Sequence, residues 1–177
     1  PAETLAAMDA GAPVIVSGRL PVDVPGHRSG FPDALVRGDD RAGGRPGYWP
    51  LRVKPYRLLE KQHNAKELRA SAIGSPTTLE PLPGFRFRSY RQGVLLELAH
   101  HWRLLQVCGR AATTPVAGVI GFDDHRKGMI VWVPLELRFL RTFSRTSANG
   151  YRLRSALERY DHEHGFRVHV AQQAMTR

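Results

Sequence analysis

Two residues of opposite charge, Asp33 and Lys54, form the most informative pair in the sequence. Asp33 follows Pro32 in a segment with the composition of a β-strand, and Lys54 ends Arg52-Val53-Lys54 in the next such segment. Alternate residues of a strand share a face, so a hairpin can bring the two side chains together. A carboxylate beside a lysine suits metal-assisted phosphodiester cleavage. The acid holds Mg²⁺ or Mn²⁺, and the lysine steadies the attacking water or the developing negative charge.

The elements that must position these residues follow from hydrophobic spacing and turn residues. The third predicted strand contains two prolines, which suggest an edge strand or a bulge, and residues 60–84 are polar and predict a surface excursion. Three strands, a helix and further strands favour a mixed sheet with helices on both faces over a doubly wound parallel sheet. The predicted helices span 3–9, 94–108 and 155–164, with 166–170 continuing the last helix or forming a strand, and the predicted strands span 12–22, 31–37, 48–59, 116–122 and 129–135.

Length and composition bound the class of protein. The chain has 177 residues, of which 42% are hydrophobic, so it can form one domain with its own core. A disordered chain, a collagen-like repeat and a disulfide scaffold are excluded, and Cys108 is the single cysteine. The longest apolar runs, such as 129–135, are too short for a transmembrane helix. We expect a cytoplasmic domain with no membrane partner. Because the sequence starts at Pro1 without an initiator methionine, and the helix predicted at 3–9 looks cut into, we also expect a fragment of a longer chain with further domains.

The charge points to a polyanionic partner. Lysine and arginine number 26 against 16 acidic residues, a formal net charge of +10, and such basic domains commonly meet nucleic acids or membrane surfaces. The excess of arginine is also consistent with a compositional bias of the genome. A P-loop and a G-x-G-x-x-G fingerprint are both missing, which excludes the ATPase and dinucleotide-binding classes. The arginines expected to follow a nucleic-acid backbone are Arg52, Arg57, Arg86, Arg88 and Arg91.

The order of these residues resembles the RecB-like branch of the PD-(D/E)xK nuclease superfamily. Pro32-Asp33 followed by Lys54 is similar to its central motif, and the segments 4–15, 30–37, 95–105 and 118–121 are also similar to RecB-type nucleases. The resemblance covers roughly residues 3–133. It implies an α/β fold with a restriction-endonuclease-like core, in which a central mixed β-sheet is flanked by helices, over a single domain of residues 1–177. The implied activity is divalent-metal-dependent DNA cleavage, on single strands or ends, in repair or recombination.

The resemblance also assigns roles to individual residues. Asp33 would bind Mg²⁺ or Mn²⁺, the backbone carbonyl of Val53 would be a further metal ligand, and Lys54 would orient the water. The RecB-like branch carries a Gln-x-x-x-Tyr motif on a helix, and the matching positions are Glu97 and His101. A metal ligand from the first helix would be either Glu3 or a residue upstream of Pro1.

Arg52 departs from the family pattern, because it occupies the position of the second acidic residue. A guanidinium cannot ligate a cation and repels one. In one interpretation the acid has moved to Glu97, which completes the catalytic set with Asp33 and Lys54. In the other, the domain binds nucleic acid without cutting it, and Arg52 and Lys54 are phosphate ligands. A protein–protein module of a larger repair protein is a third possibility. The predicted nucleic-acid-binding residues are Arg52, Arg57, Arg91 and His101.

Several of these residues have simpler interpretations. Glu97 and His101 are four residues apart and could form an exposed pair along one helix. Neighbouring histidines at 100–101 point about 100° apart on a helix, which disfavours a zinc site. The sequence at 123–125 is typical of a turn, although it could reach a metal. Trp49, with Tyr48 and Tyr56, could stack on a base, although tryptophans are mostly core residues.

Overall fold

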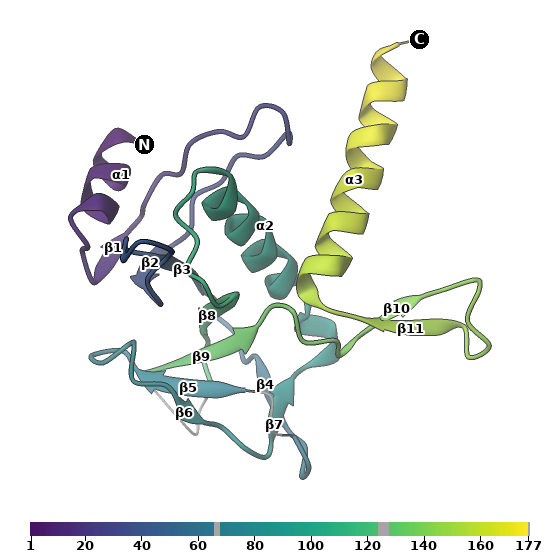
Figure 1. Cartoon of the computed structure of the whole chain (residues 1–177). Helices are drawn as coiled ribbons and strands as arrows, with labels where there is room; N and C mark the ends of the chain where they lie inside the picture. The colour runs from purple at the N-terminus through teal and green to yellow at the C-terminus, as the bar shows by residue number, and fades with distance from the viewer. Residues whose placement is uncertain (66–67, 124–127, 177) are drawn as a thin grey trace.

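A seven-stranded mixed sheet forms the centre of the protein in the computed structural model (Figure 1), which describes residues 1–65, 68–123 and 128–176. The helices in these ranges are α1 (Ala2–Asp9), α2 (Gly93–Val107) and α3 (Ala156–Met175), with a short 3-10 helix, η1 (Ser89–Arg91). The strands are β1 (Val14–Val16), β2 (Ala34–Arg37), β3 (Tyr48–Val53), β4 (Leu59–Lys61), β5 (Arg69–Ala72), β6 (Glu80–Pro81), β7 (Phe85–Phe87), β8 (Val116–Ile120), β9 (Met129–Pro134), β10 (Leu140–Phe143) and β11 (Tyr151–Arg154).

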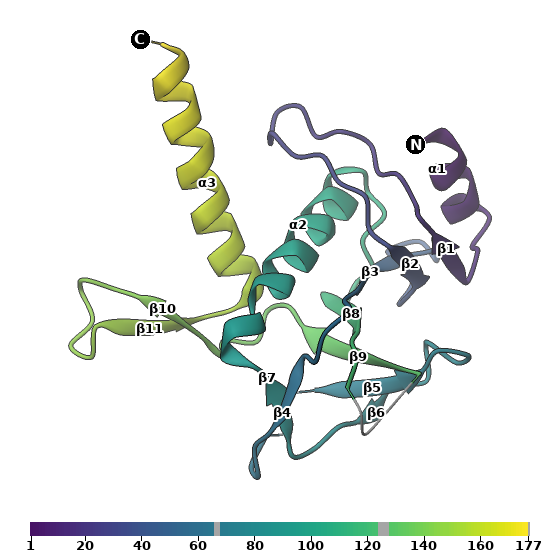
Figure 2. The ribbon, with the colours of Figure 1, turned by 180° about the vertical axis from the view of Figure 1, so that it is seen from behind.

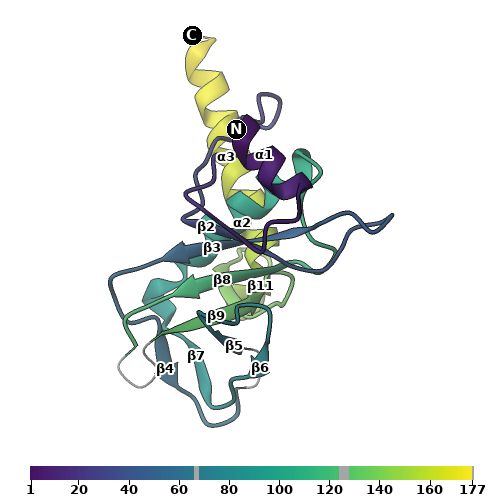
Figure 3. The same cartoon turned by 90° about the vertical axis from the view of Figure 1, so that its left-hand side faces the viewer.

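The strand order of the central sheet is β1-β2-β3-β8-β9-β5-β6. Its pairs are antiparallel except for β3 and β8, which run parallel and lie side by side in Figure 3. A parallel pair needs a long crossover connection, and that connection includes α2. The predicted mixed α/β sheet is confirmed. Two further antiparallel pairs, β4–β7 and β10–β11, form separate two-stranded sheets.

Helices α1 and α2 cover the same face of the sheet. Met8 of α1 and Leu104 of α2 are buried in one cluster with Leu35 and Tyr48, whose side chains share a face because the β2–β3 register pairs Leu35 with Pro50. The Tyr48 hydroxyl donates to the carbonyl of Ala12 at 2.9 Å, which fixes the end of α1 on this face. Helix α3 packs on α2. The prediction of helices on both faces is therefore wrong for α1 and α2.

Of the two alternatives predicted for the prolines of the third strand, an edge strand or a bulge, the edge strand is wrong, because β3 lies between β2 and β8. The ladder with β8 begins only at Leu51, which pairs with Gly118. Pro50 therefore precedes that ladder, and its missing N–H removes no hydrogen bond from it. On the opposite face of the sheet, the Trp49 ring packs against Trp132 with 5.3 Å between centroids.

The segment predicted as a surface excursion contributes to the sheet instead. Strand β5 pairs with β9, and Ala70 and Ser71 are buried there. The Ser71 hydroxyl accepts a hydrogen bond from the Trp132 indole at 2.7 Å. The sequence of β5, Arg-Ala-Ser-Ala, lacks the β-branched and aromatic residues that predict a strand, so tertiary pairing rather than propensity forms it.

A hairpin of β10 and β11 and the long helix α3 extend away from the sheet (Figure 2). The sequence predicted no strands here, and residues 166–170, left open between helix and strand, continue α3. The helix begins with a capping box, in which the Ser155 hydroxyl accepts from the Glu158 N–H and the Glu158 carboxylate accepts from the Ser155 N–H. Within the described ranges, no helix combines the length and the apolar character needed to cross a membrane.

Candidate functional site

The register of β2 and β3 places Asp33 opposite Arg52. Leu35 pairs with Pro50, and two residues further along each strand the same register reaches Asp33, just before β2, and Arg52, near the end of β3. Lys54 follows β3 directly and shares the face of Arg52, because alternate residues lie on one face. The prediction that Asp33 and Lys54 share a face therefore agrees with the register of the sheet.

Arg52 bridges two carboxylates. Its Nη1 donates to Asp33 Oδ1 at 3.0 Å, and its Nε donates to Glu97 Oε2 at 3.1 Å. The same Nη1 also donates to the backbone carbonyl of Phe31 at 3.2 Å. The guanidinium therefore lies between the carboxylate that precedes β2 and the carboxylate that α2 supplies.

Lys54 completes this group of charges. Its Nζ donates to Glu97 Oε1 and Oε2 at 2.8 and 2.7 Å, while Asp33 Oδ2 accepts from the N–H of Val53 at 2.7 Å. We call Asp33, Arg52, Lys54 and Glu97 the charge cluster. Two carboxylates face two cations in it, so its formal net charge is zero. The structure thus brings together Asp33, Lys54 and Glu97, the three residues predicted as catalytic. Arg52 lies between the two carboxylates.

The charge cluster does not fit Mg²⁺ or Mn²⁺ in this arrangement. An ion held by Asp33 and Glu97 would lie beside the Arg52 guanidinium, and a divalent ion about 4 Å from a unit positive charge is repelled by about 2 kcal/mol in bulk water and about 8 kcal/mol near a protein surface. Among the residues that the structure describes, no group of three or more His, Cys, Asp or Glu side chains could hold a metal ion. The metal-ligand role predicted for the Val53 carbonyl stays a prediction.

Glu97 does not pair with His101 along α2, because its carboxylate contacts Arg52 and Lys54 instead. His101 is only 6% exposed. It lies against Gly30, where an added Cβ would come within 2.9 Å of the ring. Burial, with charge interactions of His100, Arg52 and Lys54 as lesser causes, lowers the pKa of His101 to about 3. His101 is therefore neutral at pH 7 and offers no positive charge to a phosphate.

The other predicted contact residues lie around the start of α2 and the end of β3. Arg91 of η1 stacks on Tyr56, with its guanidinium carbon 4.0 Å from the ring centroid. Arg57 is exposed.

Glu3, one of the two alternatives for a metal ligand near the first helix, is exposed in the first turn of α1. Tyr48 and Trp49 are buried, so the prediction of Trp49 as a core residue is confirmed, and the alternative in which these two rings stack on a base is wrong.

A groove of about 640 Å³ adjoins the charge cluster, between α2 and α3. Its wall is fixed by His100, whose Nε2 donates to the Ser29 carbonyl at 2.8 Å, so that Nδ1 accepts from the Tyr160 hydroxyl at 2.7 Å. Burial lowers the pKa of His100, which agrees with this neutral ring. The lining residues include Phe31, Arg52, Glu97, His101, Glu163 and Arg167, and their charges are mixed.

Asp123, which follows β8, connects this end of the strand to the segment that leads into β4. Its carboxylate accepts from the backbone N–H groups of Leu58 at 3.2 Å and Leu59 at 3.1 Å, so its observed role is structural. Asp124 and His125, the other residues of the turn predicted at 123–125, lie outside the described residues.

Sequence reasoning missed the arginines of the β10–β11 hairpin. Residues 137–157 contain five arginines and no aspartate or glutamate, and this charge run was the available signal.

The chain matches no family model, and the searches of curated proteins and of solved structures also gave no match.

Proposed function

We propose that this chain is a nucleic-acid-binding domain with a restriction-endonuclease-like core that binds DNA without cutting it. The observation that carries the proposal is the position of Arg52 between Asp33 and Glu97. Both carboxylates are neutralised by side chains of the protein itself, so no negative charge remains there to attract a divalent cation.

The order of elements supports the proposed core. Helix α1 is followed by the antiparallel strands β1, β2 and β3, then by α2 and by β8, which is parallel to β3. This order puts Asp33 and Lys54 at neighbouring strand ends and passes α2 over them, so that Glu97 reaches Arg52 of β3 and Lys54 directly after it. The RecB-like resemblance requires the same three positions to meet.

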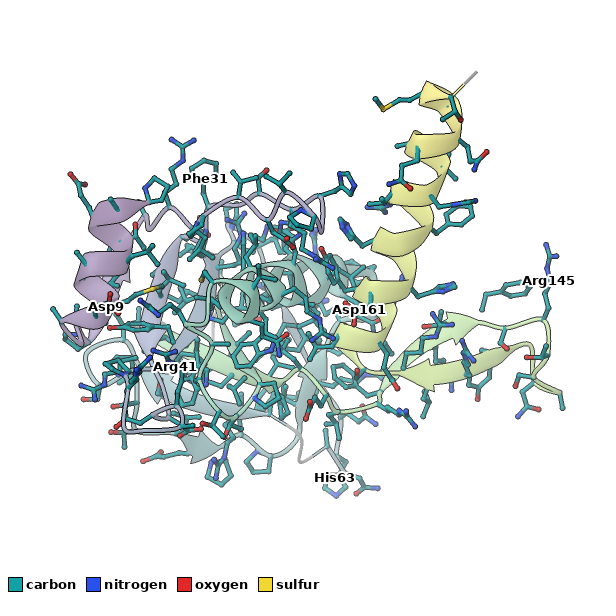
Figure 4. All side chains as sticks on the ribbon, turned by 45° about the horizontal axis from the view of Figure 1, so that its top comes forward. Asp9, Phe31, Arg41, His63, Arg145 and Asp161 are labelled. Carbon is teal, nitrogen blue, oxygen red and sulfur yellow. The ribbon has the colours of Figure 1, made fainter. Side chains whose placement is uncertain are left out.

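The distribution of charge supports nucleic acid as the partner. The chain carries a formal net charge of +10, while the charge cluster is neutral, so the excess lies elsewhere on the molecule. The hairpin holds a large share of it, with Arg145 at its tip (Figure 4). Phosphate contacts by such arginines supply affinity that does not depend on sequence.

A metal-dependent nuclease is the second candidate, because the three residues predicted as catalytic lie close together. Lys54 forms an ion pair with Glu97, and Arg52 links Glu97 to Asp33. A nuclease requires Arg52 to leave the space between the carboxylates. The two candidates differ in metal dependence, which a direct assay can measure.

The test measures binding and cleavage of labelled single- and double-stranded DNA with Mg²⁺, Mn²⁺ or EDTA. We expect binding that weakens with salt, is unchanged by EDTA, and is accompanied by no cleavage. Asp33→Ala and Lys54→Ala are compared with Asp39→Ala and Lys61→Ala, which remove the same charges at exposed positions.

Metal-dependent cleavage that both cluster variants lose, and both control variants keep, would establish the nuclease and reject the proposal. The absence of DNA binding at low salt would reject both candidates and favour a protein–protein module.

A further inference from the structure

Two adjoining hollows of about 380 and 640 Å³ lie between the β10–β11 hairpin and α3. Both are lined by Arg152 and Arg154 of β11 and by His162 of α3. The second also contacts Arg145, in the loop of the hairpin. We call the combined hollow the arginine groove; it is separate from the groove beside the charge cluster, which shares none of these lining residues.

Two of the five hairpin arginines have partners. The Arg138 Nε donates to the Glu158 carboxylate at 2.9 Å, and the Arg141 guanidinium stacks on the Tyr151 ring at 4.7 Å. Among the described residues, no side-chain hydrogen bond or ion pair joins the other three, Arg145, Arg152 and Arg154, to any neighbour. The groove therefore holds uncompensated positive charge.

Arg154 is the most unusual of these side chains, because it is only 7% exposed. Its Nη1 is buried without a hydrogen-bond partner. Burial and the like charge of Arg152 lower its pKa. Glu158, a carboxylate of α3 that lines the first hollow, is already bound to Arg138 and to the Ser155 N–H. Buried cations are normally paired, so this one lacks an anion.

Two exposed aromatic rings lie beside the same arginines. Phe143, 75% exposed, and Phe166, 65% exposed, line the second hollow from the hairpin and from α3. Rings so exposed add nothing to the core, whereas unstacked bases pack readily on such rings in proteins that bind single strands.

We propose that the arginine groove binds single-stranded nucleic acid, with Arg145, Arg152 and Arg154 on successive phosphates and Phe143 and Phe166 stacked on bases. This inference rests on the proposed function and gives it a location away from the charge cluster. A single strand fits better than a duplex, because its bases are free to stack on the two rings. A flat anionic membrane would meet the hairpin tip but not the buried Arg154.

The experiment measures binding of a fluorescein-labelled twenty-nucleotide oligothymidylate by fluorescence anisotropy over a series of salt concentrations. Arg145 and Arg152 are exposed, so the Arg145→Ala/Arg152→Ala protein is expected to fold normally. Arg45→Ala/Arg69→Ala removes the same charge from exposed positions outside the groove. The groove variant is expected to lose at least about tenfold in affinity and about 1.4 in the slope of log K against log salt. The control pair is expected to change affinity less than about twofold.

The aromatic contribution is measured separately with Phe143→Ala/Phe166→Ala. We expect about a tenfold loss of affinity with no change in the salt slope, because stacking displaces no counterions. Equal weakening by the groove pair and the control pair would refute the groove while leaving the proposed function intact. Failure of the wild-type protein to bind any oligonucleotide would refute the proposed function itself. Groove-dependent binding to phosphatidylserine vesicles or to inorganic phosphate, without oligonucleotide binding, would also overturn the inference.

Discussion

Replacing Arg52 by glutamate is expected to turn the charge cluster into a divalent-cation site. In the wild-type protein Arg52 contacts Asp33 at 3.0 Å and Glu97 at 3.1 Å, and two carboxylates balance two cations. In Arg52→Glu three carboxylates face Lys54 alone, so the formal charge of the cluster falls from zero to −2. The space between Asp33 and Glu97 is then lined by oxygen atoms, which Mg²⁺ and Mn²⁺ prefer.

The size of the effect follows from Coulomb's law. The substitution changes the charge at residue 52 by two units, and a divalent ion about 5 Å away gains about 3 kcal/mol even at the dielectric constant of bulk water. That gain corresponds to roughly 100-fold tighter binding. Arg52→Gln changes the charge by one unit, so about half the free energy and about tenfold tighter binding are expected.

Isothermal titration with Mn²⁺ measures the three affinities, and thermal unfolding with and without Mn²⁺ provides an independent check. Because ligand binding to the folded state raises stability, the melting temperature of Arg52→Glu should rise most when Mn²⁺ is added. Binding of Mn²⁺ to Arg52→Glu no tighter than to Arg52→Gln, or wild-type binding as tight as that of either variant, would refute the inhibition of metal binding by Arg52.

Two further predictions concern buried side chains that can carry a positive charge. Arg154→Met removes a desolvated charge without a partner, so the free energy of unfolding in chemical denaturation should rise by about 1 to 3 kcal/mol, and an equal or lower value would contradict the absence of a partner. Burial lowers the pKa of His101 to about 3 in the folded protein, whereas a histidine in the unfolded chain has a pKa of about 6.5. The contribution of His101 to the free energy of unfolding is therefore fully present above about pH 6.5 and is lost as the pH falls. Between pH 7 and pH 5 the wild-type protein should lose about 2 kcal/mol through this group. His101→Gln should lack that loss and the exposed control His63→Gln should retain it, and parallel pH profiles for all three proteins would contradict a buried neutral His101.

Features that depend on local pattern could be predicted from the amino-acid sequence alone. Period-two alternation around Pro32-Asp33 and Arg52-Val53-Lys54 was sufficient to place Asp33 and Lys54 on one face, because this periodicity is a property of any strand. The helical spacing of 94–108 predicted α2 within one residue at each end, because apolar residues recur on one face through its length. The charge excess was equally available, since it needs only composition.

The pairing of charged groups, in contrast, could not be predicted from local pattern. Nothing local indicates that Glu97 pairs with Arg52 and Lys54, 45 and 43 residues away in the chain, because the contact depends on how α2 crosses β3. Strand β5 likewise exists through pairing with β9 rather than through its own propensity. The arginine groove requires the hairpin and α3 to meet, and burial of Arg154 there gives one arginine among many an environment that its sequence neighbours do not specify. Long-range packing sets burial and partners, and burial and partners set the chemistry of a charged side chain.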